Sequence, residues 1–163
     1  MRNAVLGLVL VAGILFTGCS GQDGQGSPQS QMNAWVNGTG FGPALGTLEN
    51  DVKRSTEILT SGGTINEAHT VCAVLLLDVQ RANGNLPTPD ELSTQLLSDA
   101  YASLGKAAHD CYSAVGNPTK MASYSSNKNQ GLSLLSQAQA KISSVLGASF
   151  STTTTIDNGS TAQ

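Results

Sequence analysis

The chain has 163 residues, of which only 12% are charged, and its eight Lys and Arg against eleven Asp and Glu give a net charge of −3. A surface so mildly acidic disfavours nucleic acid and anionic lipid head groups as partners. The length suits one domain with flanking segments.

The chain begins with the pattern of an export signal. Arg2 precedes an apolar run over residues 4–16, which ends at the small residues Thr17 and Gly18 and then at Cys19. As a helix this run would cover about 20 Å, whereas a bilayer core is about 30 Å thick. Residues 1–18 are therefore predicted to be a secretory signal with a cysteine directly after its cleavage site.

This stretch resembles the lipobox of bacterial lipoproteins, with Phe16 where the family most often has Leu. The resemblance implies that Cys19 becomes the first residue of the mature chain and carries a thioether-linked diacylglycerol. Two acyl chains hold a protein stably on a membrane, so we expect an anchor on the extracytoplasmic face. The alternative is an ordinary secretory signal, which would leave Cys19 as a free thiol, an uncommon state in an oxidising compartment.

Residues 19–42 are rich in Gly, Ser, Gln and Asn and are predicted to be a flexible tether. Trp35 and Phe41 interrupt this composition. Either they dock back onto the folded domain as a lid, or they anchor a partner protein or the membrane interface, where aromatic side chains are favoured.

Four segments with helical periodicity follow, each with start and stop residues. Thr64 and Glu67 form a capping box before the second segment, and Thr88 is expected to cap the third, with Pro89 in its first turn. The polar stretch 125–131 is expected to fray or kink the fourth segment. The expected helices cover residues 43–61, 64–83, 88–115 and 117–147.

Short turns and the absence of strand alternation predict an all-α fold, an up-and-down four-helix bundle over residues 43–147. Aromatic residues make up only 4% of the chain, so the core is expected to consist of Leu, Val and Ala. Residues 148–163 are rich in Ser and Thr and are predicted to be a disordered tail.

Cys72 and Cys111 are predicted to form a disulfide, because an antiparallel pair of helices brings the start of one beside the end of the next. A metal site with His69 and His109 is the alternative, since zinc accepts thiolates and imidazoles. His109 lies two residues before Cys111, which turns the two side chains about 200° apart on a helix. We therefore expect no metal site.

The sequence contains no known catalytic motif and few acid–base residues, so we expect no enzyme activity and no cofactor. Asp78, within an apolar helix, is expected to pair with Arg81 or to face solvent, because an unpaired buried carboxylate is costly.

The run from Cys72 through residues 86–90 to His109-Asp110-Cys111 resembles small two-cysteine helical lipoproteins of actinobacteria or their phages. The expected function is that of a non-catalytic binding module, which holds an envelope or extracellular protein through the bundle face or the Trp35 segment. A prophage lipoprotein that excludes incoming phage would be one such case. The alternative is a carrier with a small-ligand pocket between its helices.

Overall fold

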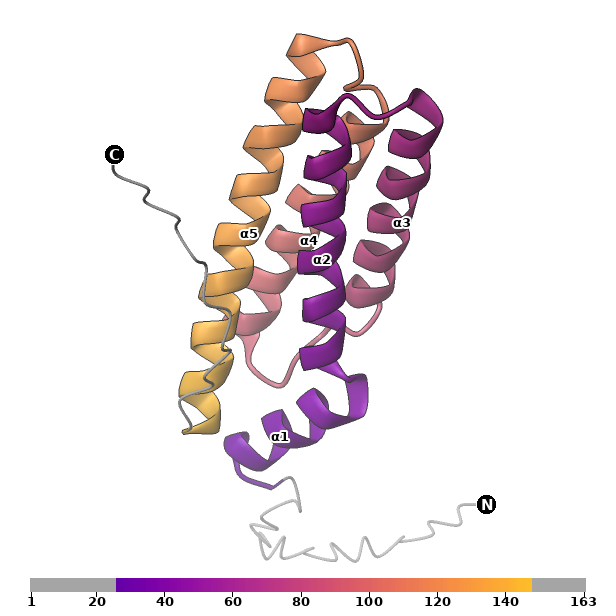
Figure 1. Ribbon diagram of the computed structural model, residues 1–163. Helices are drawn as coiled ribbons and strands as arrows, with labels where there is room; N and C mark the ends of the chain where they lie inside the picture. Colours follow the sequence, from indigo (N-terminus) through magenta and orange to yellow (C-terminus); the bar gives the residue numbers. More distant parts are fainter. Residues whose placement is uncertain (1–25, 148–163) are drawn as a thin grey trace, which may run out of the picture.

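The computed structural model describes residues 26–147 (Figure 1). The expected signal, the lipid attachment site Cys19, the first part of the tether and the tail 148–163 lie outside these residues. All regular secondary structure in the described part is α-helical, in five helices: α1 (Pro28–Thr39), α2 (Phe41–Ser61), α3 (Ile65–Asn83), α4 (Glu91–Tyr112) and α5 (Pro118–Leu146).

Helices α2 to α5 run alternately up and down, as the sequence predicts, and α1 crosses one end of the bundle (Figure 1). Along the bundle, α2 packs on α3, α3 on α4 and α4 on α5, while α1 contacts both α5 and α2. The turn between α2 and α3 uses the left-handed Gly62, at φ 77°. The capping box of Thr64 and Glu67 then starts α3. The fold class is therefore confirmed.

The tether prediction was wrong for residues 28–39, which form α1. The Ser27 side chain caps this helix by accepting a hydrogen bond from the Ser30 amide, and Pro28 occupies the first turn, where its missing N–H costs nothing. Met32 and Val36 are buried, one turn apart on the same face. This short apolar stripe packs α1 onto the bundle.

Two local expectations for the later helices were also wrong. Asp90, not Thr88, caps α4, by accepting a hydrogen bond from the Ser93 amide. The fraying expected at residues 125–131 is absent, because α5 continues through this stretch. Gly131 is buried there, and a Cβ at this position would lie 2.7 Å from the Leu104 side chain. The glycine therefore lets α4 and α5 approach closely.

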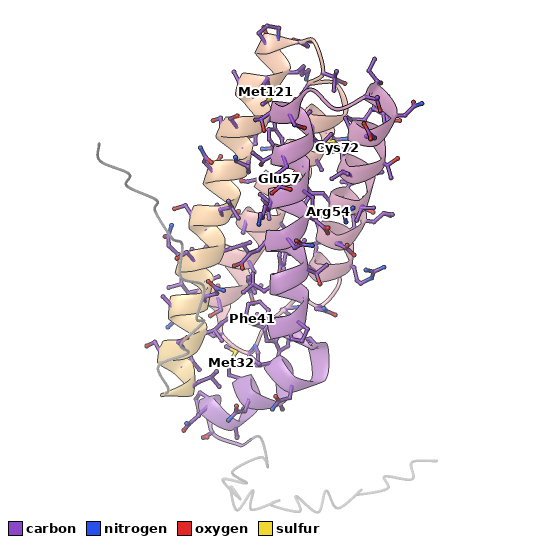
Figure 2. All side chains as sticks on the ribbon, viewed as in Figure 1. Met32, Phe41, Arg54, Glu57, Cys72 and Met121 are labelled. Carbon is purple, nitrogen blue, oxygen red and sulfur yellow. A yellow bond between two sulfur atoms is a disulfide. The ribbon has the colours of Figure 1, made fainter. Side chains whose placement is uncertain are left out.

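The disulfide between Cys72 and Cys111 is confirmed, with the two Cα atoms 5.8 Å apart. It joins α3 to α4 and packs with Ala107 and Tyr124 in a small cluster, and Cys72 lies toward the end of the bundle away from α1 (Figure 2). The main core is largely aliphatic, as expected. Its largest fully buried members outside the disulfide cluster are Met32, Leu48, Leu75, Leu97 and Leu104.

Candidate functional site

The candidate site is a groove along the edge where α2 and α5 face each other. These two helices approach each other much less than the other neighbouring pairs of the bundle. Two hollows follow this edge, of about 430 Å³ and about 670 Å³. Because Glu49, Ser136 and Gln139 line both, the hollows form one continuous groove, the α2–α5 groove.

The α2–α5 groove has an apolar floor, and small or polar residues form its rim. Between Phe41 and Thr60, the lining residues at its two ends on α2, the helix rises by about 28 Å. The rim includes exposed residues such as Gly46, Ser136 and Ala140. The apolar floor consists of Phe41, Leu45, Val52, Leu132, Leu135 and Ile142.

Two glycines of α2 widen the groove, although the packing of the described residues would leave room for a side chain at either position. Gly42 and Gly46 are exposed, and a Cβ on either would meet nothing within 4 Å. Neither has a positive φ. A glycine inside a helix costs about 1 kcal/mol relative to alanine. Unlike Gly131, Gly46 inside α2 therefore carries a cost that no contact within residues 26–147 explains.

The charged side chains of the groove leave one anion and one cation over. Lys53 and Glu57 pair with each other at 3.9 Å on the exposed rim. Among residues 26–147, neither Glu49 nor Lys128 has an ion-pair partner. The Lys128 Nζ lies 3.4 Å from the Thr56 Oγ1. The same ammonium group lies 5.6 Å from the centroid of the Tyr124 ring. The groove therefore offers a carboxylate and an ammonium group that are unmatched, in the sense that neither has an oppositely charged partner among the described residues.

Both ends of the groove are bridged. At the Lys128 end, the buried Tyr124 of α5 places its hydroxyl 2.8 Å from the Ser55 Oγ and 2.8 Å from the Thr56 Oγ1 of α2. At the other end, α1 contacts both helices, and Phe41 lies between α2 and α5 just above Met32 of α1 (Figure 2). These bridges fix the separation of α2 and α5.

The structure gives Trp35 and Phe41 packing roles. The Trp35 indole N–H donates to the Asn85 carbonyl at 3.0 Å, and its ring centroid lies 5.3 Å from that of Phe41. Trp35 is half-buried, so it docks on the bundle as one of the two alternatives expected. Phe41 is buried and lines the end of the groove. Partner binding stays a prediction for both residues, most directly for Phe41.

The other candidate residues do not form a site. His69 is stacked on Tyr112 with ring centroids 3.7 Å apart, and His109 is exposed. Both cysteines are in the disulfide. No group of three or more His, Cys, Asp or Glu within the described part of the chain is placed to hold a metal ion.

The expected pairing of Asp78 with Arg81 is confirmed. Asp51, whose pKa Asp78 influences, was not among the residues predicted from the sequence. Asp51 of α2 is only 3% exposed, and its Oδ2 has no hydrogen-bond partner. Burial raises the pKa of Asp51, and the nearby Asp78 carboxyl raises it further, while the Arg54 guanidinium lowers it. The available signal was its place in the apolar stripe of Leu48 and Val52.

Comparisons with known protein families, curated proteins and solved structures found no match. None of the helices α1 to α5 is both long and apolar enough to cross a membrane.

Proposed function

We propose that the protein is a lipid-anchored binding module on the extracytoplasmic face of the membrane, and that the α2–α5 groove holds its partner. The groove is the observation that carries this proposal. It combines an apolar floor, exposed small residues and two unmatched charges, a composition typical of binding sites. The lipobox resemblance at Cys19 supports the location.

The lining of the groove favours binding over catalysis. The residues that line its two hollows include no histidine and no cysteine, the groups that most often act as general base or thiol nucleophile. The Tyr124 hydroxyl is fully buried behind the wall, where its hydrogen bonds to Ser55 and Thr56 give it a packing role.

The anchor would hold the groove close to the membrane. Gly26, the first described residue, comes seven positions after Cys19, and a fully extended chain over seven steps spans about 25 Å at most. Gly26, directly before α1, would lie within this distance of the lipid, and the α1 end of the bundle would therefore face the membrane. A partner in the envelope, itself at or near the membrane, fits this placement.

Site-specific photocrosslinking in living cells tests the proposal. A photoreactive residue replaces Gln139, which lines the groove, or Gln130, an exposed glutamine about half a turn away around α5. We expect one discrete adduct from position 139 and none from position 130. The adduct should disappear in the Cys19→Ala variant, which should also leave the membrane fraction. Equal crosslinking from both positions would contradict the assignment of the groove.

A small-ligand carrier is the second candidate, because the volumes of the two hollows fall in the range of about 300–1,000 Å³ typical of small-molecule sites. In that case a small molecule should co-purify with the protein and be detected by mass spectrometry after extraction. The Gly46→Phe variant, which places a ring in the groove, should lose it. The matched Gly38→Phe variant, at an exposed helical glycine outside the groove, should retain it.

A further inference from the structure

We infer that the α2–α5 groove receives an amphipathic α-helix of another protein, which lays its apolar stripe on the floor and places a basic residue at Glu49 and an acidic residue at Lys128. This inference rests on the proposed binding function and specifies the chemistry of the partner. It is carried by the length of the groove, its open rim and the spacing of its two unmatched charges.

The shape of the groove suits a helix. Its length of about 28 Å equals the rise of some 18 to 19 helical residues. The rim is open, since the side chains of Lys53 and Glu57 are 74% and 60% exposed. A partner would therefore bury one face and leave the other in solvent, the mode in which amphipathic helices bind grooves.

The charges select this occupant over an alkyl-chain ligand. The Lys128 ammonium group lies beside Thr56 of α2. Thr56 follows Glu49 by seven residues, which is about two turns and 10.5 Å along α2. Residues seven apart lie on one face of a helix. A partner helix with a basic and an acidic residue at this spacing would match both charges. A fatty acid would match Lys128 alone and leave the Glu49 carboxylate beside hydrocarbon.

The two α2 glycines support the same occupant. Gly42 and Gly46 are one turn apart and line the groove near Phe41. Packed helices lie about 8–10 Å apart, with the shorter distances where the contact residues are small. With no side chain in the way, a partner helix can approach the α2 backbone closely at this end.

A selection experiment tests the inference. The probe is a displayed library of 18-residue peptides with apolar residues at helical spacing and random residues elsewhere. It is selected on the full-length protein and counter-selected on Gly46→Phe, with Gly38→Phe as the matched control. We expect enriched peptides to carry Lys or Arg seven residues from Asp or Glu. They should bind the control variant normally and the blocked variant at least ten-fold more weakly.

Charge reversal then tests the register. Glu49→Lys should weaken an enriched peptide about ten-fold, and exchanging the basic residue of the peptide for Glu should restore the loss. Failure to enrich any peptide, enrichment without the seven-residue spacing, or equal binding to Gly46→Phe would each overturn the inference. A crosslink from position 139 would still support the proposed function after such a failure, so the two outcomes are distinguishable.

Discussion

Replacing Asp51 by Asn should stabilise the protein near neutral pH. The Oδ2 of Asp51 is buried without a hydrogen-bond partner, and the negative charge of Asp78 disfavours the ionised form of Asp51. An unsatisfied buried polar group costs about 1–3 kcal/mol. Asparagine has the same shape, carries no charge and brings an amide N–H donor to this position. The substitution therefore removes the main cost of this position.

The substitution also removes the ion pair between Asp51 and Arg54, but the stability lost with this pair is small. Arg54 lies 4.0 Å from the Asp51 Oδ1, and its side chain is 53% exposed. An ion pair with one partner in solvent is worth below about 1 kcal/mol. The net gain in the free energy of unfolding for Asp51→Asn is therefore about 1–2 kcal/mol at neutral pH.

The gain should depend on pH in a defined direction. The pKa of Asp51 is raised in the folded protein above its ordinary value of 3.8. A raised pKa contributes stability that is fully present below the unfolded value and is lost as the pH rises through the folded value. The wild type should therefore lose the contribution of Asp51 over this interval, and Asp51→Asn, which lacks this titrating group, should not. The difference between them should grow with pH and then level off.

Urea unfolding followed by circular dichroism, repeated from pH about 3 to about 7, measures this difference. Asp99→Asn, at an exposed aspartate of α4, is the matched control and should leave the stability unchanged. If Asp51→Asn were less stable than the wild type by a constant amount at every pH, Asp51 would be an ionised and well-solvated group, and the reasoning would fail.

Four further predictions concern the packing of the bundle, and urea unfolding checks each. Gly46→Ala should stabilise α2 by about 1 kcal/mol, because the helix gains propensity and the new Cβ meets no neighbour within 4 Å. Gly131→Ala should destabilise by about 1–3 kcal/mol, because its Cβ would overlap a buried leucine; the same sign at both glycines would contradict this distinction. Tyr124→Phe should lower the free energy of unfolding by about 1 kcal/mol, since it removes the hydroxyl that bridges α5 to α2. An unchanged free energy of unfolding would show that these hydrogen bonds do not stabilise the fold. Replacing Cys72 and Cys111 together by Ala should cost about 2–5 kcal/mol, and an unchanged urea midpoint would mean that the disulfide does not form.

The sequence predicts most of the bundle because its local signals are strong and agree. Thr64 and Glu67 have the spacing of a capping box, and the structure has both hydrogen bonds. Gly147 follows the last apolar residue of the fourth segment and ends α5 in a left-handed conformation. The disulfide prediction needed only the antiparallel arrangement of two adjacent helices, which a short connection enforces.

The misses arise where local signals are weak or distant contacts decide. Helix α1 has an apolar stripe of only Met32, Trp35 and Val36 in a polar segment, and packing against α2 and α5 stabilises it. The groove depends on the distance between α2 and α5, which no residue pattern in either helix specifies. Asp51 lies in the apolar stripe of α2. The sequence alone cannot tell whether a charged side chain in such a stripe is buried or exposed, because this depends on where the neighbouring helix packs.

Helix α1 and the α2–α5 groove, which the sequence did not predict, together determine how a partner would bind. Helix α1 holds α2 and α5 at one end of the groove, where Gln29 donates to the Leu146 carbonyl of α5. Tyr124 joins them at the other. Because both ends are fixed by packed or hydrogen-bonded groups, the edge between them is held open by the fold. A partner would then enter a preformed groove, without the cost of separating two packed helices, so its affinity would depend on how well it fits the floor and the two charges.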